Sequence, residues 1–184
     1  VTGDPLPADA KLAWWREELH GWAALRSRHP LGRRLEPVRA AWSQLADALP
    51  ALVAARDMSA SDEEAFASLA GYGEAVARVE ADVLGRAPGA DAIVAQVLAG
   101  RLAEFGVAAV PSTRRQPDDG ATVRRWAAEL ARYWGDPRRG ARERRVLSTY
   151  AHARLLRFSK QGAPAPLPSR PALLFTGWRA ARGD

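Results

Sequence analysis

The sequence predicts an all-α protein, and three observations support this. Apolar residues recur every three or four positions over most of the 184-residue chain, as they do on one face of an amphipathic helix. Proline and glycine residues separate these segments. No segment shows the period-two alternation of a half-buried strand. We therefore expect a helical bundle that forms a single domain over residues 1–184, because a chain of this length builds one substantial core.

The first helix should begin near Asp9 and end before His29-Pro30, because a residue that precedes proline avoids helical backbone angles. Its apolar stripe consists of Leu12, Trp15, Leu19 and Trp22. Trp15 and Trp22 should therefore lie inside the protein. Trp14 lies off this stripe and is placed to face a neighbouring helix or a cavity.

The second helix should begin near Pro37, a residue suited to a first helical turn, and should kink at Pro50. Its apolar residues are Val38, Ala41, Trp42, Leu45 and Leu49. The third helix has the clearest start, since Ser61 can cap the first free amides and Glu64 can reach back to the amide of Ser61. Its small residues, which would let another helix or a ligand approach the backbone, are Gly71, Gly73, Ala75 and Ala77.

The fourth helix should run from about Ala90 to Phe105 and end at Gly106. Residues 107–120 lose the apolar period and contain two prolines and a glycine, which predicts a long loop. Loops of this length inside a compact domain are often functional or disordered.

Helical periodicity returns in the C-terminal third of the chain. Two helices carry Val123, Trp126, Leu130 and Tyr133, and then Val146, Leu147, Tyr150, Leu155 and Phe158. Gly135-Asp136-Pro137 separates them. A Pro-rich turn at residues 161–171 leads into a last short helix with Leu173, Leu174 and Trp178.

The charge is unevenly distributed. The net charge is +6 and the isoelectric point is near 10.6. Residues 1–100 contain 10 basic and 14 acidic residues, whereas residues 101–184 contain 17 basic and 7 acidic residues. A surface that binds a polyanion should therefore lie in the C-terminal half. Of the 27 basic residues only Lys11 and Lys160 are lysines, so the codon usage of a GC-rich genome accounts for part of the arginine excess.

Several classes of function lose support. The chain has no cysteine, which excludes disulfides, thiolate catalysis and zinc–thiolate sites. Its three histidines are scattered, and no P-loop, Gly-x-Gly-x-x-Gly or Gly-x-Ser-x-Gly pattern occurs. We expect no membrane span and a cytoplasmic protein, with contact to the inner membrane at most peripheral.

The carboxylates offer little for a metal ion. No two acidic residues are spaced three or four apart, which is the spacing that places two carboxylates on one helical face. Glu17 and Glu18 are neighbours, so they point about 100° apart and should face away from the Trp15 stripe. Asp118 and Asp119, in the expected loop, are the remaining metal candidates.

The arginines favour an anionic ligand. They form two groups: Arg114, Arg115, Arg124 and Arg125, and then Arg138, Arg139, Arg142 and Arg145. Guanidinium groups bind phosphate oxygens bidentately. The alternative is a solvated face in an arginine-rich protein.

The segment KLAWWREEL at residues 11–19, followed by HPL at 29–31, resembles a helix and turn of the squalene/phytoene synthase family, in which Leu-x-Trp-Trp-Arg-Asp/Glu-x-Leu precedes a His-Pro. Further segments resemble the family in the expected order: LAGYGEAVA at 69–77, AGRL at 99–102, RLLR at 154–157, and ALL at 172–174. The resemblance covers most of the chain and is specific around residues 11–31.

This resemblance implies a shortened helical bundle of the isoprenoid-synthase type. Active members join two prenyl diphosphates head to head with Mg²⁺ held by two Asp-rich helices. The first Asp-rich motif would precede the Trp-Trp helix, but Asp4 and Asp9 do not form the pair of aspartates that this motif needs. The second Asp-rich motif should follow Arg101, but the sequence there has Glu104, Phe105 and Gly106. The candidate ligand-binding residues are Trp14, Tyr72, Arg101, Arg114, Arg115 and Arg142.

Three hypotheses follow. The leading one is a non-catalytic member that needs no cofactor and binds an isoprenoid or another apolar ligand, or acts through a protein partner, as a non-catalytic branch of the family related to respiratory complex I assembly does. The second is a prenyltransferase that uses Mg²⁺, with its N-terminal Asp-rich helix missing here. The third is a basic helical module for anionic lipid or nucleic acid, and nucleic acid ranks last because no DNA-binding motif is present.

Overall fold

A computed structural model describes residues 5–162 and 169–182, and in these residues the protein is all-α, as predicted. The α-helices are α1 (Pro5–Ala23), α2 (Gly32–Leu35), α3 (Trp42–Ala48), α4 (Ala51–Ala54), α5 (Asp62–Leu84), α6 (Ala90–Phe105), α7 (Asp119–Trp134), α8 (Arg142–Gln161) and α9 (Arg170–Arg182). Two 3₁₀ turns, η1 (Gly106–Ala109) and η2 (Ser112–Arg114), lie between α6 and α7.

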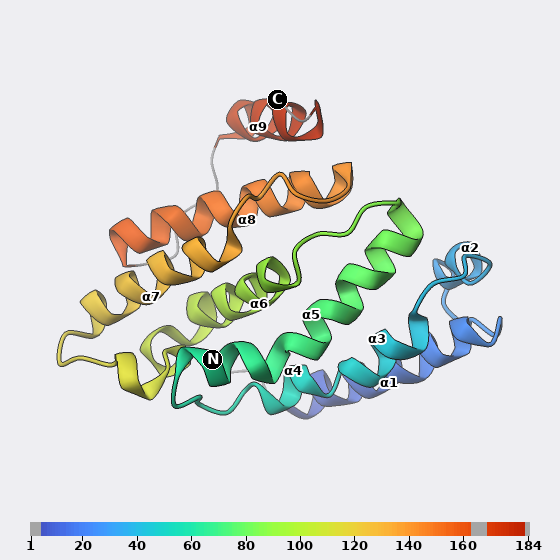
Figure 1. Cartoon of the computed structure of the whole chain (residues 1–184), viewed down its shortest axis with the longest axis horizontal. Helices are drawn as coiled ribbons and strands as arrows, with labels where there is room; N and C mark the ends of the chain where they lie inside the picture. Colours follow the sequence, from blue (N-terminus) through green and yellow to red (C-terminus); the bar gives the residue numbers. More distant parts are fainter. Residues whose placement is uncertain (1–4, 163–168, 183–184) are drawn as a thin grey trace.

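The helices are arranged largely in chain order, each against its neighbour (Figure 1). α1 packs on α3, α5 lies between α3 and α6, and α7, α8 and α9 follow in sequence. This neighbour-to-neighbour arrangement places α1 and α9 at opposite sides of the molecule.

Two hydrophobic clusters stabilise this arrangement. The central cluster joins α5, α6, α7 and α8, with Leu69, Leu102, Trp126 and Leu130 completely buried at its centre. The N-terminal cluster joins α1, α3 and the C-terminal half of α5 around Trp22 and Trp42. α5 contributes to both clusters and so connects the two parts of the chain.

The first helices differ from the prediction at their ends. α1 begins at Pro5 and ends at Ala23, well before Pro30, because the following residues fold back onto the helix. The second helix begins at Trp42 rather than near Pro37. The expected interruption at Pro50 is confirmed, since α3 ends at Ala48 and α4 begins at Ala51.

The third and fourth helices follow the prediction closely. Ser61 Oγ accepts a hydrogen bond from the Glu64 backbone N–H at 3.2 Å, which confirms the N-cap. The Glu64 carboxylate reaches back to the N–H of Ala60, one residue before the amide that we predicted. Among the small residues of α5, Gly73 allows the close approach: a Cβ there would lie 2.8 Å from the Ala90 carbonyl oxygen and 2.9 Å from Val94 Cγ2 on α6.

The predicted loop at 107–120 contains two 3₁₀ turns, and α7 already begins at Asp119. Val110 and Pro111 are buried in it, so this segment belongs to the packed structure. The Pro-rich turn at 161–171 falls largely outside the described residues.

One stretch of the described residues bears on the expectation that the chain has no membrane span. Within the described residues, the stretch Ala90–Ala109 is long and apolar enough to cross a membrane, with a mean hydropathy of 1.4. Length and composition are weak evidence, and α6 lies between α5 and α7 with Val94, Leu98 and Leu102 buried. We therefore regard α6 as a core helix of the bundle.

Candidate functional site: an arginine cleft beside α7

A cleft of about 520 Å³ lies between the first turn of α5, η2 and the first turns of α7. We call it the arginine cleft after three of its residues, Arg114, Arg115 and Arg125. The other lining residues are Ser61, Asp62, Glu63, Thr113, Gln116, Thr122 and Trp126.

Backbone hydrogen bonds hold η2 against the residues that precede α5. The N–H of Ser112 donates to the Ser59 carbonyl at 3.0 Å, and the N–H of Thr113 donates to the Ala60 carbonyl at 3.1 Å. The Thr113 hydroxyl donates to the same Ala60 carbonyl at 2.9 Å. These bonds join segments that are more than 50 residues apart in sequence, and they place Arg114 and Arg115 beside α5.

Arg114 has a structural role in the cleft. Its guanidinium forms a bidentate ion pair with Asp62, whose side chain is 7% exposed, and lies 5.8 Å from the ring centroid of Trp126. The hydrogen bonds to Asp62 raise the pKa of Arg114. Arg114 therefore neutralises a buried carboxylate and closes one wall of the cleft.

Arg115 and Arg125 are arranged differently. Arg115 donates to the carbonyls of Val110 at 3.2 Å and Ala108 at 3.0 Å, and Arg125 donates to the Gln116 side chain. Both side chains are exposed, and neither pairs with a carboxylate in the part of the chain that the structure describes. Two positively charged groups are thus oriented by neutral oxygens, with further N–H donors left for a ligand.

Two other features of the cleft are a charged carboxylate and an unpaired hydrogen-bond donor. Glu63 is exposed at the start of α5, and hydrogen bonds from its own N–H and from Ser61 lower its pKa, so it opposes an anion that enters from this side. The indole N–H of Trp126 is buried without a hydrogen-bond partner among the described residues. Because Arg114 is paired with Asp62 and Glu63 is acidic, Arg115 and Arg125 form the positively charged side of the cleft.

The two metal candidates, Asp118 and Asp119, lie at the start of α7. Asp118 is the N-cap of α7, and its Oδ1 accepts the N–H of Ala121 at 3.0 Å. Asp119 is the first residue of the helix rather than part of a flexible loop. No group of three or more His, Asp or Glu side chains that could hold a metal ion occurs among the described residues.

The six candidate ligand-binding residues do not converge on one site. Arg114 and Arg115 share the arginine cleft, whereas Arg142 is the first residue of α8. The whole length of α7 separates η2 from the start of α8, and Figure 1 shows these two points at opposite ends of α7.

Arg101, Tyr72 and Trp14 lie in other places. Arg101 donates to the backbone carbonyl of Arg56 at 2.6 Å, and burial lowers its pKa. Tyr72 packs against the N-terminal cluster, where burial raises its pKa. Trp14 is 37% exposed and contacts Trp15 and His29, with ring centroids 4.8 and 6.0 Å apart.

The prediction for Glu18 was wrong. Its side chain is 1% exposed, and Oε1 accepts hydrogen bonds from the Trp22 indole (2.8 Å), the N–H groups of Arg28 (2.8 Å) and His29 (2.7 Å), and the Ser27 hydroxyl (3.1 Å). Glu18 thus binds the turn that follows α1, while Glu17 is exposed as expected. Trp22 is buried, as predicted, and Trp15 is only partly buried.

A second, more apolar groove of about 390 Å³ lies between α1 and α4. Leu12, Ala13, Leu49, Pro50 and Val53 form its apolar lining, and Asp9, Arg16, Glu17 and His20 complete it. This groove is formed by other elements than the arginine cleft.

Comparison of the chain with known protein families, characterised proteins and solved structures finds no match.

Proposed function

We propose that this chain is a binding protein of squalene/phytoene synthase-like origin that holds a phosphorylated ligand in the arginine cleft and does not transfer prenyl groups. The observation that carries the proposal is the pair Arg115 and Arg125, which line one cleft without a carboxylate partner among the described residues. The resemblance around residues 11–31 supports the origin.

The geometry suits a ligand that has several anionic oxygens. The Arg115 guanidinium is oriented by two backbone carbonyls, so little side-chain entropy is lost when its remaining N–H groups bind an anion. Arg125 offers a second fork on α7. Two guanidinium groups suit the several oxygens of a diphosphate, which is the head group that the family resemblance implies.

The sequence around the cleft supports binding without transfer. In active members a carboxylate-bound Mg²⁺ neutralises the leaving diphosphate. Here Glu104, Phe105 and Gly106 occupy the second motif position, and Asp118 is engaged as a helix cap. We therefore propose that arginines bind the phosphate oxygens directly and that binding needs no divalent cation.

The test is a titration of the protein with inorganic pyrophosphate and with farnesyl diphosphate, each with EDTA present. We expect both to bind, and the double variant Arg115→Gln/Arg125→Gln to bind at least about tenfold more weakly. The variant Arg33→Gln/Arg34→Gln, which removes two exposed arginines of α2, is the matched control and should bind like the wild type.

Two results would contradict the proposal. Equal affinities of the cleft variant and the control variant would show that the ligand does not bind in the arginine cleft. Pyrophosphate release from farnesyl or geranylgeranyl diphosphate with Mg²⁺, above a control without protein, would show that the chain is a prenyltransferase. Tighter binding of farnesyl diphosphate than of pyrophosphate would extend the site to an isoprenoid chain.

A further inference from the structure

The last helix has one face packed on the protein and one face left outside it. Ala180 is 3% exposed, and the carbonyls of Ala180 and Ala181 accept hydrogen bonds from Arg145 of α8 at 3.1 and 3.0 Å. The Tyr150 hydroxyl donates to the Leu173 carbonyl, and a Cβ at position 177 would lie 2.5 Å from the oxygen of that hydroxyl. α9 is thus attached to α8 through a defined face.

The outward face carries three exposed large apolar side chains close together in sequence. Leu174, Phe175 and Trp178 are 76%, 60% and 53% exposed. The rings of Phe175 and Trp178 are stacked, with centroids 6.2 Å apart. Such a patch is costly in water and marks a contact surface when it is contiguous.

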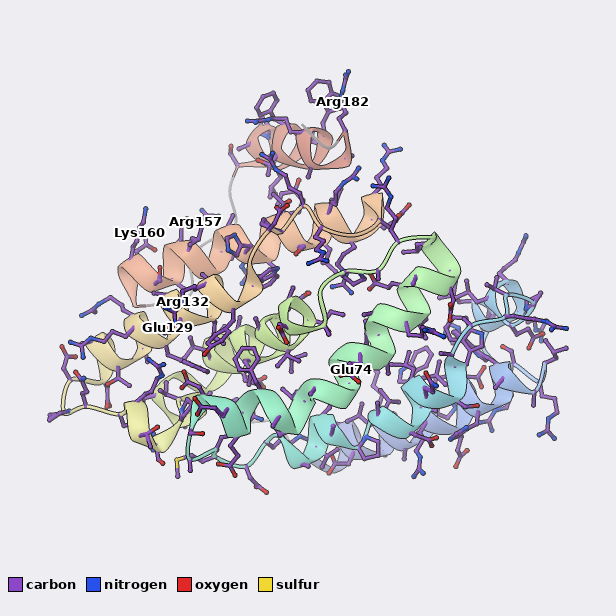
Figure 2. All side chains as sticks on the ribbon, viewed as in Figure 1. Glu74, Glu129, Arg132, Arg157, Lys160 and Arg182 are labelled. Carbon is purple, nitrogen blue, oxygen red and sulfur yellow. The ribbon has the colours of Figure 1, made fainter. Side chains whose placement is uncertain are left out.

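Cationic groups lie directly on this patch. The guanidinium of Arg179 is 6.0 Å from the Phe175 ring centroid, and that of Arg182 is 4.6 Å from the Trp178 ring centroid. Figure 2 shows Arg182 at the outer side of α9, and Arg157 and Lys160 on the edge of α8 that lies toward α9. Residues 142–182 contain nine basic residues and a single acidic one, Glu143, and of the basic residues Arg144 is paired with Glu80 of α5.

We propose that the outward face of α9 docks the protein onto an anionic membrane surface, with the helix lying in the plane of the lipid head groups. Aromatic and aliphatic side chains would enter the acyl boundary while arginines bind lipid phosphates, which is the pattern of interfacial helices. A second protein would have to be acidic to fit the same surface, and a lipid leaflet offers both the negative charge and the apolar layer. Thirteen residues of helix extend about 20 Å, which is too short to cross a bilayer.

This inference does not depend on the arginine cleft, because α9 contributes none of the cleft residues. The test is co-sedimentation of the full chain with vesicles made of equal parts phosphatidylglycerol and phosphatidylcholine, and with vesicles of phosphatidylcholine alone. We expect binding to the anionic vesicles and at least about tenfold weaker binding to the neutral ones.

Two variants test the two parts of the surface. Leu174→Ser/Phe175→Ser/Trp178→Ser should reduce binding by at least about tenfold, and Arg179→Gln/Arg182→Gln by about fivefold or more. The controls change residues of matched exposure elsewhere: Leu31→Ser/Met58→Ser, whose side chains are 54% and 56% exposed, and Arg33→Gln/Arg34→Gln. Circular dichroism verifies that each variant is folded.

Three outcomes would overturn the proposal: equal binding to neutral and anionic vesicles, equal effects of the α9 variants and the controls, or absence of vesicle binding. Concentration-dependent self-association that Leu174→Ser/Phe175→Ser/Trp178→Ser abolishes, without vesicle binding, would identify a second copy of the chain as the occupant. Oligonucleotide binding that only Arg179→Gln/Arg182→Gln abolishes, again without vesicle binding, would assign the surface to nucleic acid.

Discussion

The turn after α1 and the contact of α5 with α6 and α8 both shield a carboxylate from water, but backbone donors predominate in the first and a side chain in the second. In the turn, Glu18 accepts from two backbone N–H groups, an indole, a hydroxyl and, at 3.3 Å, the guanidinium of Arg28, all within 11 residues of it. In the α5–α6–α8 contact, Glu80 forms a bidentate pair with Arg144, 64 residues away, which also donates to Gln96 at 2.8 Å.

The difference shows how distance along the chain shapes a polar contact. A turn has free backbone N–H groups that need an acceptor, and a single carboxylate can satisfy several of them. The backbone groups inside two packed helices are already hydrogen-bonded within each helix. A carboxylate on one helix is therefore paired with a charged side chain of the other. The turn should therefore respond strongly to loss of its carboxylate and to acid. Three predictions test the turn and a fourth tests the contact of α5 with α6, from the largest effect to the smallest.

Replacing Glu18 with Ala should lower the free energy of unfolding by about 4 kcal/mol. The reason is that the indole of Trp22 and the N–H groups of Arg28 and His29 would lose their acceptor. Urea denaturation measures this. Glu17→Ala, beside it and with a side chain 72% exposed, is the control and should stay within about 0.5 kcal/mol of the wild type. A similar loss for both variants would show that the Glu18 contacts add nothing.

Acid should destabilise the protein through the same carboxylate. Burial by itself raises the pKa of Glu18, but hydrogen bonds from His29, Trp22, Arg28 and Ser27 outweigh it and lower the pKa from 4.5 to about 2. Because the folded pKa lies below the unfolded one, this stabilisation is present above pH 4.5 and is lost as the pH falls toward 2. The loss should reach about 3 kcal/mol.

Denaturation at about pH 6 and about pH 3 measures about 2 kcal/mol of this loss, because the remainder is lost only as the pH falls to 2 and below. Glu18→Gln cannot titrate at position 18 and should show a smaller difference between the two pH values than the wild type. Equal differences for the two proteins would assign the acid sensitivity to other carboxylates.

Replacing Gly32 with Ala should destabilise the turn by about 2 kcal/mol, since a Cβ there would meet Ser27 Oγ and would lie 2.6 Å from Trp22 Cε2. The Trp22 ring cannot move aside, because it packs edge-on against Trp42 with centroids 5.0 Å apart. Thermal unfolding of Gly32→Ala and of Gly100→Ala, where a Cβ meets no atom within 4 Å, gives the comparison. A melting temperature of Gly100→Ala as low as that of Gly32→Ala, or lower, would contradict the packing explanation.

The smallest effects should separate two glycines of α5. Gly73→Ala should cost about 1 kcal/mol, because a Cβ there would crowd the Ala90 carbonyl of α6. Gly71→Ala should instead stabilise by up to about 1 kcal/mol, since nothing lies within 4 Å and alanine favours helix. Urea midpoints that move in the same direction for both variants would show that the α5–α6 contact is looser than described.

The sequence predicted the helical elements better than the candidate site. The start at Ser61 and the extent of α6 were confirmed, because capping residues and the apolar period act within a few residues of each other. The helix expected near Pro37 begins at Trp42, where a tertiary contact is made: the N–H of Ala41, the residue before the helix, donates to the carboxylate of Asp82 on α5 at 3.1 Å.

Of the site, the sequence identified Arg114 and Arg115 as a pair but could not separate their roles. Asp62 makes Arg114 structural, and this contact spans 52 residues. Arg125 belonged to the arginine group seen in the sequence, but only the fold brings it into the same cleft as Arg115.

The sequence by itself determined an all-α protein, the strong helices and the positive C-terminal half, because local spacing and composition specify these. Only the tertiary structure decided that Glu18 turns inward, that Gly73 meets α6, and that Leu174, Phe175 and Trp178 remain outside. The apolar period of a helix indicates that one face is to be buried, but the partner that buries it, or leaves it exposed, comes from elsewhere in the chain.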